Sequence, residues 1–178
     1  MKTVKIAVAM IVACAVPLFA DGTGISLAGI WRGDSVKTGG TVEVGFPFVE
    51  KNLIIRDYVT LNGYGGKVNE LSFGELSIGD KLQIGGRVDC GTFHIVPYGF
   101  VNAEFGIYRT SAKKFFEAPF ILDIGGGGGF EIRYLVMQMP MQSFFIEFGG
   151  GGMLMPGKPA GGFSAGYASL AIGYRTYF

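Results

Sequence analysis

Two glutamates, Glu131 and Glu147, are the residues of this 178-residue chain best placed to do chemistry together. Each lies in a segment of alternating apolar residues, and folding the chain back about Met139 sets the two directly opposite each other on one face of a hairpin. Paired carboxylates can perform general acid–base catalysis. Arg133 and Arg175 are candidate counterions, so we expect a salt-bridge network here and not a catalytic pair.

The glycine run Gly125–Gly129 is a candidate phosphate cradle. It lacks the Gly-Lys-Ser/Thr ending of a P-loop, and Phe130–Tyr134 continues as a strand where a P-loop would open a helix. The run therefore does not indicate nucleotide binding.

A second run, Gly149–Gly152, faces the first in the same hairpin, with Gly129 opposite Gly149 and Gly127 opposite Gly151. Glycine inside a strand costs roughly 0.5–1 kcal/mol each, so this bare patch needs a reason. One reason is a bent wall or the packing of bulky inner neighbours such as Tyr98 and Tyr167. The functional alternative is a thinned wall through which an apolar molecule could pass sideways. The candidate lateral-opening glycines are Gly127, Gly129, Gly149 and Gly151.

The remaining reactive side chains are few. His94 is the single histidine and has no serine near it, so a hydrolase triad is not indicated. One histidine and one cysteine, Cys90, do not make a metal ligand set. We predict no catalytic residue, no metal site and no cofactor.

The first residues predict a secretory signal peptide over residues 1–20. Two lysines precede the apolar run Ile6–Phe19, and Ala20 is a small residue suited to cleavage. The run is shorter than the roughly 20 residues of a membrane-spanning helix. A lipoprotein cleavage that would lipidate Cys14 is the less favoured alternative.

The rest of the chain, residues 21–178, is predicted to form one all-β domain. The 31 glycines, 16 phenylalanines and 8 tyrosines favour strands and turns. The 15 basic and 14 acidic residues nearly balance, so no nucleic-acid partner is indicated. Cys90 alone would remain after cleavage, which excludes an intramolecular disulfide.

Eight segments are long enough to cross a membrane as tilted strands of roughly 9–11 residues. They are Gly24–Arg32, Gly40–Val49, Leu53–Tyr64, Ser72–Asp89, Phe93–Tyr108, Pro119–Val136, Gln142–Leu154 and Gly162–Phe178. The connections between them alternate between longer and shorter, beginning with the longer Gly33–Gly39, as external loops and periplasmic turns do. The pattern predicts an eight-stranded antiparallel up-and-down transmembrane β-barrel with both termini periplasmic.

Alternation assigns the two faces of each strand. Large apolar residues such as Val42, Phe105, Phe130 and Phe148 fall outward. The charges fall inward and form a predicted structural network of Glu43, Lys81, Arg87, Glu104, Asp123, Glu131, Arg133, Glu147 and Arg175. We expect Lys81 to pair with Glu104, and Arg87 to lie near Asp89 and His94. Asp57 and Asp80 fall outward, which we interpret as misassigned register within residues 53–84.

The leader, the eight alternating segments and the terminal Tyr-Arg-Thr-Tyr-Phe together resemble the small eight-stranded outer-membrane barrels of diderm bacteria, of the OmpA/OmpX/OmpW kind. The resemblance implies an outer-membrane location, contact with outer-membrane lipids and a client relation to the outer-membrane assembly machinery. The residues that resemble its recognition signal are Leu170, Ile172, Tyr174 and Phe178.

The function expected from these features is a structural role or the passage of small apolar solutes, without catalysis and with a monomer favoured. A surface-binding module or adhesin remains an alternative, for which the loop residues Lys113–Phe116 are candidates to contact lipopolysaccharide. A soluble, secreted lipocalin-like barrel that binds a small ligand is another. In that case the outward faces would form the core.

Overall fold

The structure is a computed structural model that describes residues 22–32, 35–68, 71–110, 120–134, 141–155, 162–163 and 166–177. Eight long strands make up the wall. They are β1 (Gly22–Arg32), β2 (Ser35–Glu50), β3 (Leu53–Val68), β4 (Leu71–Gly86), β6 (Phe93–Thr110), β7 (Phe120–Tyr134), β8 (Met141–Met155) and β10 (Tyr167–Tyr177). Two short strands, β5 (Val88–Asp89) and β9 (Gly162–Phe163), extend single hairpins.

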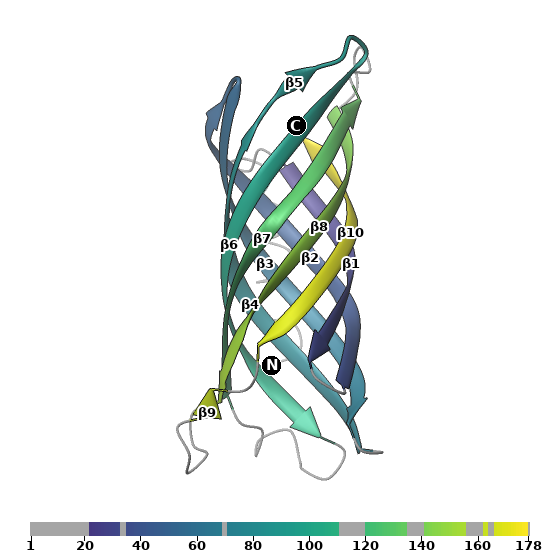
Figure 1. The fold of residues 1–178 in the computed structure, drawn as a ribbon, viewed down its shortest axis with the longest axis vertical. Helices are drawn as coiled ribbons and strands as arrows, with labels where there is room; N and C mark the ends of the chain where they lie inside the picture. The colour runs from purple at the N-terminus through teal and green to yellow at the C-terminus, as the bar shows by residue number, and fades with distance from the viewer. Residues whose placement is uncertain are drawn as a thin grey trace, which may run out of the picture.

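The sheet closes on itself. Each long strand pairs antiparallel with its neighbours in the chain, and β10 pairs with both β8 and β1. Figure 1 shows the resulting cylinder of tilted strands, with β10 beside β1. The predicted fold class, an eight-stranded antiparallel up-and-down barrel, is confirmed. No helix in the described part of the chain is long and apolar enough to cross a membrane.

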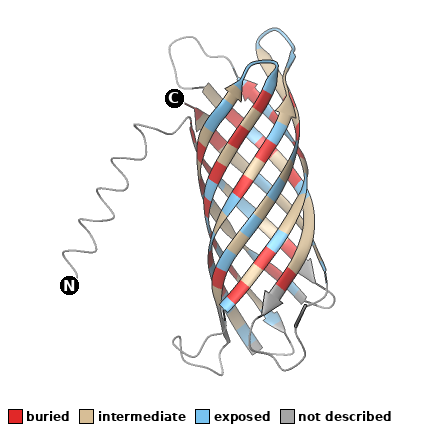
Figure 2. Ribbon diagram, turned by 90° about the vertical axis from the view of Figure 1, so that its left-hand side faces the viewer, coloured by how far each residue is buried: buried red, intermediate tan, exposed pale blue. Residues whose placement is uncertain are grey.

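Burial alternates residue by residue along the strands (Figure 2). Outward side chains such as Leu27, Val101 and Phe148 are 75%, 60% and 54% exposed, whereas Arg56 and Arg175 on the inner face are fully buried. The faces predicted from alternation are confirmed. A barrel whose apolar side chains point outward and whose charges point inward is built for contact with lipid.

Two of the predicted longer loops are instead largely strand. β2 begins at Ser35 and β3 continues to Val68, so Gly39, Gly65 and Gly66 lie within strands. An added Cβ at Gly39 would meet the Tyr64 ring, and one at Gly66 would meet the Phe73 ring. These glycines therefore accommodate aromatic rings and do not mark turns, which is why the loop prediction was wrong there.

The β7–β8 hairpin has a different register from the predicted one. Gly127 lies opposite Gly149 and Gly125 opposite Gly151, while Gly129 lies opposite Glu147. Glu131 consequently faces Phe145, so the prediction that Glu131 and Glu147 are direct partners is wrong. A slip by an even number of residues keeps every side chain on its face, and alternation alone cannot distinguish the two registers.

The interpretation of Asp57 and Asp80 as signs of misassigned register is also wrong. Their chain neighbours Tyr58 and Lys81 are buried in the lumen, while Asp80 is exposed and Asp57 half-buried on the outer face. The two aspartates do face outward.

We predict that Gly129→Ala destabilises the barrel while Gly63→Ala does not. A Cβ at Gly129 would lie 2.5 Å from the Ile146 carbonyl oxygen and 2.8 Å from the Tyr98 ring, whereas a Cβ at Gly63 would meet no atom within 4 Å. Overpacking costs about 1–3 kcal/mol. Urea unfolding of the barrel in lipid vesicles measures the difference, and equal unfolding midpoints for the two variants would contradict this account.

Candidate functional site

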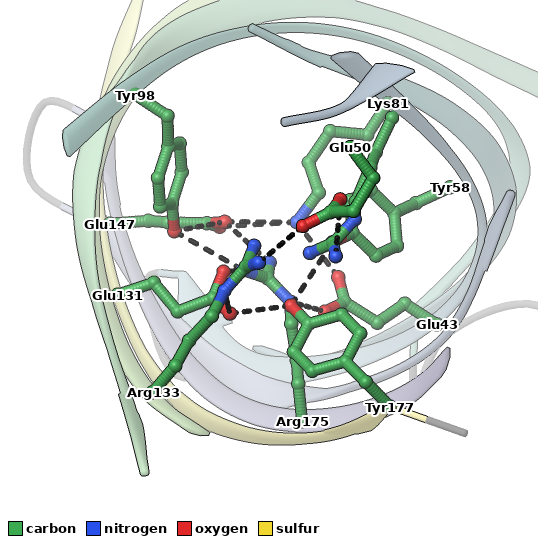
Figure 3. A network of polar contacts seen from close by, with 11 residues as sticks. Glu43, Glu50, Tyr58, Lys81, Tyr98, Glu131, Arg133, Glu147, Arg175 and Tyr177 are labelled. Atoms are coloured by element: carbon green, nitrogen blue, oxygen red, sulfur yellow. Dashed lines mark hydrogen bonds and ion pairs between the residues drawn. The ribbon is translucent and has the colours of Figure 1, made fainter. Parts of the chain in front are cut away.

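Arg175 of β10 lies at the centre of the lumen, and three carboxylates from three other strands converge on it (Figure 3). Its Nε donates to Glu43 of β2, its Nη1 donates to Glu131 of β7 at 3.1 Å, and its Nη2 donates to Glu147 of β8 at 2.9 Å. The guanidinium offers five N–H donors in a planar fork. One arginine can therefore hold carboxylates on several sides.

Lys81 of β4 completes the ring from the opposite wall. Its Nζ lies 2.8 Å from Glu43 and 3.0 Å from Glu147. The Tyr98 hydroxyl donates to Glu147 at 2.9 Å. Each of the carboxylates of Glu43 and Glu147 is thus shared between Arg175 and Lys81.

A second cluster continues the network toward the terminal end of the barrel, where β1 begins and β10 finishes. Arg133 donates to Glu131 at 2.7 Å and to Glu50 at 2.6 Å, and Arg56 lies 2.6 Å from Glu50. The Tyr177 ring is 4.1 Å from the Arg56 guanidinium and 4.8 Å from that of Arg133. The Tyr177 hydroxyl donates to Glu131 at 2.6 Å.

The network is balanced in charge. Its acids are Glu43, Glu50, Glu131 and Glu147, and its bases are Arg56, Lys81, Arg133 and Arg175. Removing charges from water is tolerated only when they are paired and hydrogen-bonded. Seven of these eight residues are buried, Glu50 being the exception. In an eight-stranded barrel the lumen is just wide enough to be filled by side chains, and here these side chains fill it.

The predicted counterions of Glu131 and Glu147 are correct, since Arg133 pairs with Glu131 and Arg175 with both glutamates. The predicted pairing of Lys81 with Glu104 is wrong. Lys81 lies beside Asn102 on the ladder and reaches across the lumen to β2 and β8. Such contacts between non-neighbouring strands leave no local pattern in the sequence.

Glu104 instead accepts hydrogen bonds from Ser77 at 3.0 Å and Asn102 at 3.1 Å. Asp123, opposite the half-buried Glu104 on β7, is buried in the lumen. These two predicted network residues therefore lie apart from the Arg175 cluster.

Arg87 also lies outside the Arg175 cluster. Its Nε is 3.3 Å from Asp89, and the same carboxylate oxygen is 2.9 Å from His94 Nε2, as the sequence predicted. The Asp89 side chain is 63% exposed. This group belongs to the β5–β6 turn, where Cys90 is also exposed.

Sequence reasoning missed Arg56, Glu50 and the buried pair of Lys37 with Glu75, whose closest atoms are 2.8 Å apart. The usable signal was alternation along β3, where Ile54, Arg56 and Tyr58 share the inner face. The outward Asp57 obscures this pattern, because it places a charge on the other face of the same strand.

A cavity of about 70 Å³ lies in the lumen on the far side of the Arg175 cluster from the terminal end. Lys81, Glu147 and Phe100 line it, together with the backbone of Gly126 and Gly150. A groove of about 300 Å³ marks the outer face of the same wall. The groove is lined by Leu82, Ile84, Gly99, Phe100, Val101 and Gly127. Phe100 lines both spaces, so only one layer of chain separates them there.

The inner glycines of β7 and β8 lie beneath large side chains. A Cβ at Gly129 would meet the Tyr98 ring, and a Cβ at Gly125 or Gly151 would lie 2.7 Å from the Tyr167 hydroxyl. The predicted packing of Tyr98 and Tyr167 over the patch is confirmed.

The residues of the predicted assembly signal follow one outer face of β10. Ile172 is 58% exposed, and the Tyr174 ring packs edge-on against Phe144 with centroids 5.3 Å apart. Leu170 is half-buried on the same face, and Phe178 lies outside the described residues. Among the described residues no group of three or more His, Cys, Asp or Glu could hold a metal ion.

No family model matches the sequence, and no curated protein matches it. Solved structures do resemble the barrel. Neisserial surface protein A superposes with a TM-score of 0.54 at 16% identity, over 88% of this chain and 95% of that one. A major outer membrane protein from Thermus thermophilus superposes with a TM-score of 0.49 at 14% identity, over 88% of this chain and 99% of that one. The outer membrane enzyme PagL superposes with a TM-score of 0.44 at 13% identity, over 87% of this chain and 99% of that one.

At 16% identity the likeness to Neisserial surface protein A shows the fold alone. Together with the outward apolar face and the inward charges, it defines this chain as a small eight-stranded barrel of the outer-membrane type.

We predict that Arg175→Leu destabilises the barrel far more than Arg87→Leu. Removing Arg175 leaves Glu43, Glu131 and Glu147 short of a counterion in the lumen, and breaking a buried ion pair costs about 3–5 kcal/mol. The partly exposed Arg87 pair contributes at most about 1 kcal/mol. Urea unfolding in vesicles compares the two variants, and a similar loss in both would refute a central role for Arg175.

Proposed function

We propose that this chain is a non-catalytic integral protein of the outer membrane whose barrel is closed to ions and water-soluble solutes and has a structural role in the envelope. The observation that carries the proposal is the balanced charge network around Arg175, which crosses the lumen from β2, β4, β7, β8 and β10. An ion passing through would have to displace buried, doubly paired side chains.

The outer surface supports a membrane location over a soluble lipocalin-like barrel. The exposed large apolar side chains include Ile25, Leu61, Ile78, Phe105 and Phe130 on five different strands. A soluble monomer rarely exposes a continuous apolar surface of this kind. Outer-membrane lipids would be its partners, and Leu170, Ile172, Tyr174 and Phe178 would address the assembly machinery. The loop Lys113–Phe116, on which an adhesin role would depend, lies outside the described residues.

We expect the purified protein to leave the conductance of a planar lipid bilayer at its baseline. The double variant Lys81→Ala/Glu147→Ala removes one acid and one base from the network and should raise the conductance, because it opens space without leaving an unpaired charge. The matched control Lys37→Ala/Glu75→Ala removes a buried pair outside the network and should stay closed. Channel activity of the unaltered protein would overturn the proposal.

A second candidate function is lateral passage of small apolar solutes between the lumen and the membrane. The thin wall at Phe100, Gly126 and Gly127 favours it, because one layer of chain separates the lumenal cavity from the outer groove there. Of the glycines predicted from sequence, Gly127 and Gly149 lie at this place, whereas Gly129 and Gly151 are covered by tyrosines.

If apolar solutes pass here, Gly99→Leu should lower their uptake by expressing cells several-fold. Gly99 lines the groove, and a Cβ there would meet one atom only, at 3.6 Å, so a side chain can begin at this position without a clash and extend over the groove. Gly74→Leu is the matched control, because Gly74 is exposed on the same barrel and has no atom within 4 Å of an added Cβ. Equal uptake by the two folded variants would exclude this route.

A further inference from the structure

The outer wall carries two acidic side chains inside its apolar surface. Asp57 of β3 and Asp80 of β4 point away from the lumen, because Tyr58 and Lys81 beside them point into it. They are diagonal neighbours across the β3–β4 ladder, where Asp57 pairs with Leu82 and Asp80 pairs with Val59.

The surroundings of the pair are apolar on every strand that borders it. Asp80 lies between Ile78 and Leu82 on its own strand and opposite Val59 and Ala103 on the next two. The outward positions nearest the pair are Val44 and Phe46 on β2, Ile55, Val59 and Leu61 on β3, Ile78, Leu82 and Ile84 on β4, and Val101, Ala103 and Phe105 on β6. None of them titrates. The charged Arg56 and Lys81 lie on the lumenal side of the wall.

As diagonal neighbours on one face of an antiparallel ladder, Asp57 and Asp80 have side chains close enough to interact with each other. A hydrogen bond between two carboxyl groups needs a proton on one of them, because a carboxylate only accepts. An ionised carboxylate facing lipid is costly, and two like charges at one site cannot both be kept there. A shared proton removes one of the two charges and satisfies both groups without a partner protein.

We propose that Asp57 and Asp80 hold one proton between them on the lipid-facing wall, so that the stability of the inserted barrel falls as the pH rises. The inference rests on the barrel lying in a membrane and is independent of whether any solute passes through it. As the pH rises, the pair releases one proton to water and gains one negative charge.

The direction follows from proton linkage. The unfolded chain in water has ordinary aspartates, which lose their protons near pH of about 3.9. Above that pH the folded barrel binds one proton more than the unfolded chain. Stability therefore declines with rising pH, by up to about tenfold in the unfolding equilibrium constant per pH unit. The decline ends when the pair itself has lost its proton.

The test is urea unfolding in phosphatidylcholine vesicles between pH 5 and 9. The wild type should lose stability across this range, and Asp57→Asn/Asp80→Asn should lose much less and be the more stable protein at the high end. Asp89→Asn, which removes an exposed acid on the β5–β6 hairpin, is the matched control and should still lose stability across this range. A flat wild-type profile, or an unchanged slope in the double variant, would overturn the proposal.

A second readout does not depend on the variant folding. Infrared spectra of the folded wild type at neutral pH should contain the C=O stretching band of a protonated carboxyl group, which should disappear as the pH is raised. Asp89→Asn should retain the full band, and the double variant, where it folds, should show a weaker one. Absence of the band from the wild type at neutral pH would refute the shared proton, whatever the conductance or uptake experiments show.

Discussion

Arg175 lies where a water-filled passage would run in a wider barrel, and its contacts reach Glu43, Glu131 and Glu147 on strands far apart in the chain. Sheet hydrogen bonds join only neighbouring strands, so contacts across the lumen are what relate β2 and β7 to β10 directly. A buried charge is stable only with its partners in place. The closed, fully registered barrel is the arrangement that brings all of these partners together.

This constraint determines the composition of the two faces. Because the lumen is filled by paired charges and tyrosines, the apolar residues are left to the outside, and the protein has little conventional hydrophobic core. In the described part of the chain, Ile54, Val96 and Tyr98 form a cluster of only three buried residues. Hydrophobic stabilisation of such a barrel must come from lipid around it and not from its own interior. The outward Asp80 is notable because it departs from this rule in the middle of apolar neighbours.

Alternation in the sequence predicted the fold and the faces because a strand has a period of two and a membrane barrel has two chemically opposite sides. It could not predict the β7–β8 register, where a slip of two residues preserves every face while moving Glu147 from Glu131 to Gly129. Nor could it predict that Lys81 reaches Glu43, because that contact depends on the diameter and stagger of the closed sheet. The face on which each side chain lies follows from the local sequence, whereas its partners across the lumen depend on how the sheet closes into a barrel.

The glycine patch of β7 and β8 has two separate physical explanations, one for each face. On the inner face, Gly125, Gly129 and Gly151 make room for the tyrosines that cap the lumenal cavity and bind the network. On the outer face, a Cβ at Gly126 or Gly150 would lie 2.8 Å and 2.7 Å from backbone carbonyl oxygens of the adjoining strands. Aromatic packing therefore explains the inner glycines without any opening. The wall is thin because both of its faces lack side chains at this one place. Lateral passage would require a solute to cross the wall there.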